Sequence, residues 1–191
     1  MKLYGNSPSP FVRHCRIALL ESGLDFEFIH DIDYQMSKKL SPTQKIPFLE
    51  YGEAGATKML TDSTSILRYV REQAGQIFMP SVQELNDYCA VNTLIDAQVN
   101  LFLLKKEGFS SESVNYLQRQ QNRIQTGLQE FEGHAFPEHA PWNDVVLRLG
   151  CFLGWIEFRK HLSLEPFPQL RALHERLKDY EPFKATMPVD S

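Results

Sequence analysis

Residues Met1–Gly23 read MKLYGNSPSPFVRHCRIALLESG and decide the fold of the N-terminal part of the chain. Met1–Gly5 is a short β-type run, and the apolar side chains within Phe11–Ser22 recur at helical spacing. Proline is favoured at the first position of a helix and glycine just past its end, so Pro10 and Gly23 mark the two ends. The stretch therefore predicts a strand that turns directly into a helix.

The alternation of strands and helices continues beyond this stretch. The elements expected next are a half-buried strand, the two strands of a hairpin and a helix: Asp25–Asp31, Pro47–Tyr51, Thr57–Leu60 and Thr64–Gln73. Turn-prone residues at Gly52–Gly55 join the two hairpin strands, and the chain between Ile32 and Ile46 reads as a loop. This order of elements predicts an α/β domain over residues 1–76.

The second part of the chain is helical. Strand-like alternation ends after Met79–Pro80, which predicts a domain boundary and an all-α domain over residues 82–191. The helices expected there are two long antiparallel ones, a central one that is apolar on every side and a last amphipathic one: Leu85–Phe102, Val114–Phe131, Trp142–Phe158 and Leu170–Leu177. Between the two long helices, Gly108 supplies a stop and Ser110 a new N-cap.

Charge and hydropathy exclude several classes of function. The chain has 191 residues, of which 20 are lysine or arginine and 24 are acidic, so its formal net charge is -4. A protein without a basic excess is poorly suited to neutralise a phosphate backbone, so we expect no nucleic acid partner. No apolar run approaches the roughly 18 residues of a membrane span, and the N-terminus reaches a turn before a secretory apolar region develops. We therefore expect a soluble cytoplasmic protein that does not bind a membrane.

Cysteine and histidine spacing gives no metal site. Cys15, Cys89 and Cys151 are odd in number and widely separated, which suits neither a disulfide framework nor a zinc site and fits a reducing compartment. The six histidines show no metal-ligand spacing on a shared helix face. We expect no bound metal.

Three sites in the sequence either carry chemistry or only shape the backbone. Ser9 is a natural N-cap, and a serine hydroxyl at a helix N-terminus can also donate a hydrogen bond to an anion such as a thiolate. Pro47 is either a strand-initiating trans proline or a cis proline. Asp62 and Ser63 either cap the following helix, or they form a site in which Ser63 holds a carboxylate and Asp62 pairs an ammonium group.

Together, four motifs followed by an all-helical half resemble the cytosolic glutathione transferase superfamily over nearly the whole chain. The motifs are SPFVR at 9–13, RIAL at 16–19, KIPFL at 45–49 and DS at 62–63. The resemblance implies an α/β thioredoxin-like N-terminal domain that binds glutathione, followed by an all-α helical-bundle domain.

The resemblance also implies that Ser9 is the catalytic residue and contacts the glutathione sulfur. A free thiol has a pKa of about 8.5, and lowering it by about 2 units needs roughly 2.7 kcal/mol of thiolate stabilisation. One charge-assisted hydrogen bond and a helix dipole can supply this jointly. Ser7 also precedes a proline and is the alternative contact for the sulfur. We favour Ser9, because it stands immediately before the first residue of the helix. No cysteine stands here, so thiol–disulfide exchange is not expected.

The same resemblance implies the remaining glutathione contacts. Ile46 would offer its backbone to the cysteinyl part of glutathione, ahead of a cis Pro47. Asp62 and Ser63 would bind the γ-glutamyl end, and Lys45 would lie near the glycyl carboxylate. The implied function is a glutathione transferase that activates the thiolate for attack on a small, apolar electrophile, with glutathione as co-substrate.

Two departures from the family pattern support an alternative. The connection Ile32–Lys45 is shorter than is usual in the family, which predicts a vestigial second helix there. Pro141 stands where a capping serine or threonine is expected before Asp144. A binding or protein-interaction module that kept the fold and lost efficient catalysis would tolerate both.

The resemblance further implies a homodimer. Within the first long helix, Val91, Leu94 and Leu101 lie off the main apolar stripe and need a second burial partner. That partner is either the central helix or another subunit.

Overall fold

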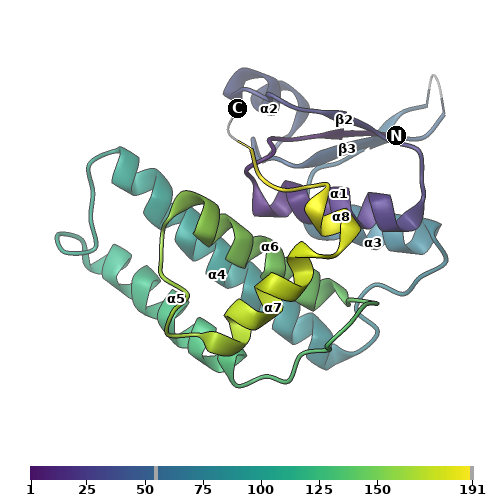
Figure 1. The fold of residues 1–191 in the computed structure, drawn as a ribbon. Helices are drawn as coiled ribbons and strands as arrows, with labels where there is room; N and C mark the ends of the chain where they lie inside the picture. The colour runs from purple at the N-terminus through teal and green to yellow at the C-terminus, as the bar shows by residue number, and fades with distance from the viewer. Residues whose placement is uncertain (54–55, 190–191) are drawn as a thin grey trace. The chain divides into compact units, whose positions relative to one another are not determined.

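The computed structural model describes residues 1–53 and 56–189 of the chain. Its elements follow in the order β1 (Lys2–Tyr4), α1 (Pro10–Ser22), β2 (Glu27–Ile29), α2 (Tyr34–Leu40), β3 (Phe48–Tyr51), β4 (Lys58–Leu60), α3 (Ser63–Gln73), α4 (Val82–Lys106), α5 (Asn115–Glu132), α6 (Asp144–Arg159), α7 (Pro168–Lys178) and α8 (Glu181–Lys184) (Figure 1). The chain forms two compact units, and the expected fold class, an α/β domain followed by a helical one, is confirmed.

The first unit is built on a four-stranded mixed sheet with the order β2-β1-β3-β4. Strand β1 pairs parallel with β2 and antiparallel with β3, and β3 pairs antiparallel with β4. Leu3 lies at the centre, opposite Phe28 on one side and Leu49 on the other, and is fully buried. The expected hairpin is therefore present, although residues 54–55 of its turn lie outside the described chain.

Helix α1 begins and ends where the sequence predicts. The Ser9 side chain caps it, Pro10 is its first residue, and Gly23 ends it in the left-handed conformation with φ 64°. The loop expected after β2 instead contains the short helix α2, whose N-terminus is capped by Asp33. Because α2 buries only Ser37, it has almost no apolar face, and its sequence carries no periodic signal.

The second unit consists of α4, α5, α6 and most of α7. Helix α4 packs against both α5 and α6, and α6 is buried along nearly its whole length, as expected for a central helix. Val91 and Leu94 on α4 are buried within this single chain. Val91 and Leu94 therefore need no second subunit to be buried and give no support for a dimer, whereas Leu101 is half-buried in this chain.

One expected cap of the helical unit is wrong, and another helix start has a cap that the sequence analysis did not name. Helix α5 begins at Asn115 behind Val114, which makes no side-chain cap, while Ser110 belongs to a turn further upstream. The broken capping motif before Asp144 is replaced by Asn143, whose side chain accepts a hydrogen bond from the Val146 amide at 2.9 Å.

The C-terminal stretch from Leu177 belongs to the first unit, which comprises Met1–Pro80 and this stretch, whereas the helical unit spans Ser81–Arg176. The expected helical domain over 82–191 therefore ends earlier than the helical pattern does. Buried Arg13 donates a hydrogen bond to the Phe183 carbonyl at 2.8 Å, and its guanidinium lies 3.6 Å from the centre of the Phe183 ring. Helical periodicity shows which face of α8 is apolar but not which unit covers it.

None of the described helices combines the length and the hydropathy that crossing a bilayer would need.

Candidate functional site

The pairing of the strands brings three segments to one edge of the sheet. Tyr4, the last residue of β1, pairs with Phe48, the first of β3. Leu60, the last residue of β4, pairs with Leu49. Because both pairings are antiparallel, the chain after β1, the chain before β3 and the chain after β4 all emerge at this edge. These segments carry the residues expected at a glutathione site.

The turn from β1 into α1 is tight and positions Ser9. Gly5 follows β1, and a Cβ on it would lie 2.5 Å from Val12 Cγ2, so only glycine fits. Ser9 Oγ accepts a hydrogen bond from the Val12 amide at 3.4 Å. Within the described chain, the Ser9 hydroxyl donates to no acceptor. That hydrogen is therefore available to an anion at the N-terminus of α1.

Ser7 makes a different contact. Its Oγ accepts a hydrogen bond from the backbone amide of Val189 at 3.3 Å, so it ties down the C-terminal stretch of the same unit. Ser9 alone of the two stands at the N-cap of α1. Of these two serines, Ser9 is therefore the one whose hydroxyl lies at the N-terminus of α1.

Charge near α1 is suited to an anion. The first turn of the helix contains no acidic residue, and Arg13 and Arg16 follow on successive turns. Burial lowers the pKa of Arg16 from its ordinary value, and the positive charge of the neighbouring Arg13 lowers it further. The dipole of α1 adds positive potential at its N-terminus.

The segment before β3 has the expected backbone. The Ile46–Pro47 peptide bond is cis, which decides between the two alternatives left by the sequence. Pro47 is buried, Ile46 is half-buried and Lys45 is exposed. The Ile46 backbone lies immediately before β3, where an extended peptide can pair with it.

The segment after β4 is a helix N-terminus. Asp62 Oδ1 accepts hydrogen bonds from the amides of Thr64 and Ser65 at 2.9 and 3.2 Å, so Asp62 caps α3, which begins at Ser63. Asp62 is exposed whereas Ser63 is buried. One carboxylate oxygen of Asp62 thus serves the cap, and the side chain is open to solvent.

Asn6 and Cys15 make contacts within this unit that the sequence alone does not predict. Asn6 holds the chain after β2, since its Nδ2 donates to the Ile32 carbonyl at 3.0 Å and its Oδ1 accepts from the Ile32 amide at 2.7 Å. Cys15, fully buried on α1, lies 3.8 Å from the carbonyl oxygen of Ser63. Each joins segments far apart in sequence, which periodicity cannot reveal.

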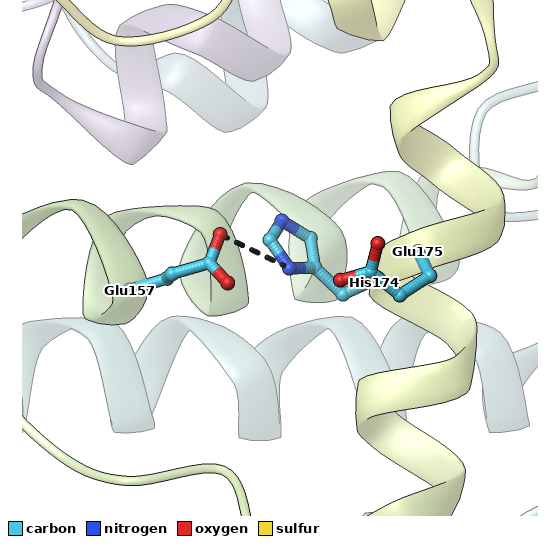
Figure 2. Close-up of side chains that lie close together, drawn as sticks. All are labelled: Glu157, His174 and Glu175. Atoms are coloured by element: carbon cyan, nitrogen blue, oxygen red, sulfur yellow. Dashed lines mark ion pairs between the residues drawn. The ribbon is translucent and has the colours of Figure 1, made fainter.

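A group of potential metal ligands lies in the helical unit. Glu157 of α6 and His174 and Glu175 of α7 place one ligand atom each within 4.8 Å of the others. Figure 2 shows Glu157 facing the buried His174, whose Nδ1 lies 3.8 Å from a carboxylate oxygen of Glu157. Ligand atoms on a tetrahedral zinc are only about 3.4 Å apart, so this spacing is wider than coordination requires. Histidine spacing along the sequence gives no sign of this group, because its three residues lie on two different helices.

Comparisons with known proteins show which proteins this chain is similar to. Residues 3–77 match the family model described as the N-terminal domain of glutathione S-transferase. An uncharacterised GST-like protein of Escherichia coli (strain K12), YibF, is 27% identical over 209 residues, covering 98% of this chain and 98% of the relative.

Two solved structures share the fold. A glutathione S-transferase from Methylobacterium radiotolerans, in complex with glutathione sulfonate, is 22% identical with a TM-score of 0.84 and covers 100% of this chain and 95% of its own. A glutathione S-transferase from Methylobacillus flagellatus with glutathione bound is 21% identical, again with a TM-score of 0.84, and covers 98% of this chain and 99% of its own. The likeness extends over both units.

Proposed function

We propose that this chain, which belongs to the cytosolic glutathione transferase superfamily, is a glutathione transferase that activates the glutathione thiolate for attack on a small, apolar electrophile. The observation that carries this proposal is Ser9 at the N-cap of α1, with a hydroxyl hydrogen that has no acceptor in the described chain. In this role the hydroxyl donates to the thiolate and is not itself a nucleophile.

The other segments at the sheet edge support the same ligand. Ile46, ahead of the cis Pro47, would pair its backbone with the cysteinyl residue. Asp62 would pair the ammonium of the γ-glutamyl residue, with Ser63 beside its carboxylate, and Lys45 would neutralise the glycyl carboxylate. No metal takes part in the proposed reaction.

The test of Ser9 must separate catalysis from helix capping. Ser9→Ala should lower kcat/KM for conjugation of a chlorodinitrobenzene-type substrate by about tenfold or more and raise the pKa of the bound thiol toward about 8.5. Ser9→Thr keeps both the hydroxyl and the helix cap and should restore most of the rate.

Ser81→Ala is the matched control, because the Ser81 side chain caps α4 by accepting a 3.1 Å hydrogen bond from the Glu84 amide. It should lose about 1 kcal/mol of stability without changing the thiol pKa. An unchanged thiol pKa in Ser9→Ala would assign the role elsewhere.

Asp62 allows a second separation of the two roles. Asp62→Asn keeps an oxygen that can accept from the Thr64 amide but removes the charge. It should weaken glutathione binding about tenfold in calorimetry while the unfolding free energy stays within about 0.5 kcal/mol of wild type. Equal glutathione affinity in both proteins would remove Asp62 from the site.

Calorimetry with glutathione also decides between the enzyme and the alternative module. Binding of micromolar order with turnover supports the transferase. Binding without turnover leaves a glutathione-dependent binding or protein-interaction module. Absence of binding contradicts both assignments of the sheet edge.

We also propose that the protein is a homodimer with a two-fold axis, in line with the prevalence of symmetric dimers. Light scattering should give about twice the chain mass of 22.1 kDa. A monomer mass would contradict this assignment without affecting the glutathione site.

A further inference from the structure

The C-terminal strap, defined as Tyr180–Val189, is tied to both ends of helix α1. At the C-terminal end of the helix, the Tyr180 hydroxyl donates to a carboxylate oxygen of Glu21 at 2.6 Å. At the other end, the backbone amide of Val189 donates to Ser7 Oγ at 3.3 Å, in the turn that leads into the helix. The strap therefore follows α1 and reaches the segment that carries the proposed catalytic serine.

Buried groups hold the strap between these two contacts. Arg13 donates to the Phe183 carbonyl and lies over the Phe183 ring, which fixes helix α8 against α1 (Figure 1). Thr186 is fully buried, and its hydroxyl donates to the carbonyls of Pro182 and Phe183 at 2.8 and 3.1 Å. Buried polar groups whose hydrogen bonds are satisfied make a segment rigid. The chain after α8 thus leaves in a defined direction, toward Ser7.

The turn before α1 is stiff, and Ser7 and Ser9 lie only two residues apart in it. The Ser9 amide donates to the Asn6 carbonyl at 3.0 Å, which closes the turn. Pro8 and Pro10 each fix φ near about −65°, so few dihedral angles are free to change between the two serines and the helix. A displacement of Ser7 is therefore passed on to Ser9.

Side chains anchor this turn at two points. Asn6 fixes its start through both hydrogen bonds to the backbone of Ile32, and Ser7 fixes its corner to the strap. The cap itself is a weaker constraint, because the bond from the Val12 amide to Ser9 Oγ measures 3.4 Å, longer than the usual range of about 2.7–3.2 Å. Loss of the Ser7 anchor would leave the hydroxyl of Ser9 less well oriented.

We propose that Ser7 is a positioning residue for the glutathione thiol: its hydroxyl holds the Val189 amide and thereby keeps the turn where Ser9 Oγ points at the sulfur. The inference rests on the proposed function of Ser9. It gives the two serines different roles, since Ser7 acts through Ser9 and does not touch the sulfur. A misplacement of about 1 Å at a reacting group can cost on the order of 100-fold in rate, so a contact outside the reacting atoms is enough to affect catalysis.

The test removes each side of the Ser7–Val189 hydrogen bond in turn. Ser7→Ala removes the acceptor, and Val189→Pro removes the N–H donor. Each should lower kcat for conjugation by about fivefold, the effect of one hydrogen bond, and leave KM for glutathione within about twofold of wild type. Each should also raise the pKa of the bound thiol by about 0.7 unit, measured from the ultraviolet absorbance of the thiolate. The double variant should show no larger change than either single variant, because both substitutions break the same bond.

Conservative and remote variants separate positioning from stability. Ser7→Thr keeps a hydroxyl acceptor and Val189→Ala keeps the amide, so both should restore the thiol pKa of the wild type. Tyr180→Phe is the matched control, because it releases the opposite end of the strap from Glu21. It should reduce the free energy of unfolding without changing the thiol pKa. Circular dichroism checks that each variant is folded.

An unchanged thiol pKa in Ser7→Ala and Val189→Pro would overturn the inference. A raised pKa in only one of the two would also overturn it, and a change in Ser7→Ala alone would make Ser7 itself the contact for the sulfur. An equal shift in Tyr180→Phe would assign the effect to general loosening of the strap.

Ser9→Ala distinguishes failure of this inference from failure of the proposed function. An unchanged thiol pKa in Ser9→Ala, or no binding of glutathione by the wild type, refutes the proposed function and the positioning role with it. A raised pKa in Ser9→Ala, together with wild-type values in Ser7→Ala and Val189→Pro, refutes the positioning role alone.

Discussion

Among mutations that remove a charge from the first unit, those in the buried ion pair between Arg71 and Glu21 should reduce the free energy of unfolding most. Arg71 Nη2 of α3 lies 2.6 Å from a Glu21 carboxylate oxygen of α1, and the two side chains are 7% and 12% exposed. The hydroxyl of Tyr180 donates to the other oxygen at 2.6 Å, which joins the C-terminal stretch to the same carboxylate. Glu21→Gln keeps the shape but removes the negative charge that lies against the guanidinium. Removing one partner of a buried pair costs about 3–5 kcal/mol, and we expect about 3 because the amide oxygen can still accept.

The same helix provides a matched control. Arg68 and Glu72 form a pair of 2.8 Å on α3, but their side chains are 71% and 52% exposed. Solvent screens such a pair, so Glu72→Gln should cost less than about 0.5 kcal/mol. The contrast between two glutamate-to-glutamine changes therefore isolates burial as the cause.

The assay is urea unfolding followed by two probes. Far-UV circular dichroism reports on both units, whereas tryptophan fluorescence reports on the helical unit, because Trp142 and Trp155 both lie there. The loss in Glu21→Gln should appear in the dichroism midpoint. Equal stability of the two glutamine variants would refute the reasoning. Glu21→Leu combined with Arg71→Met should recover most of the loss, since apolar replacement of a whole buried pair is often neutral.

Further predictions concern packing and pH. Gly5→Ala should destabilise the first unit by about 1–3 kcal/mol in urea unfolding because the new Cβ clashes with Val12, whereas Gly133→Ala, with its nearest contact at 3.4 Å, should change little. Burial and Glu21 raise the pKa of Tyr180, so the folded state keeps its proton longer, and unfolding free energy should fall as pH rises above about 10. Tyr180→Phe should flatten that alkaline slope. The pKa of His161 is lowered on folding, so stability should fall as pH drops below about 6.5, and a smaller fall is expected in His161→Asn. An acid slope equal to wild type would contradict the assignment to His161.

Local signals in the sequence determined the secondary structure and much of the candidate site. Serine, proline and glycine at 9, 10 and 23 mark the ends of α1 because capping depends on a few neighbouring backbone groups. The apolar pattern of α6 similarly identified the central helix. The family resemblance identified the three segments later found at one sheet edge, and it implied the cis peptide bond at Pro47 that the position of the proline alone had left open.

Tertiary structure decided the features that depend on contacts between distant residues. Assignment of the C-terminal stretch to the first unit depends on Arg13 meeting Phe183 and on Tyr180 meeting Glu21, contacts that no periodicity encodes. Short α2 gave no periodic signal because it buries almost no apolar surface, and only the short family connection Ile32–Lys45 indicated a vestigial helix there. Caps and periodicity are local properties of the chain, whereas ion pairs and unit boundaries arise only when distant segments pack together.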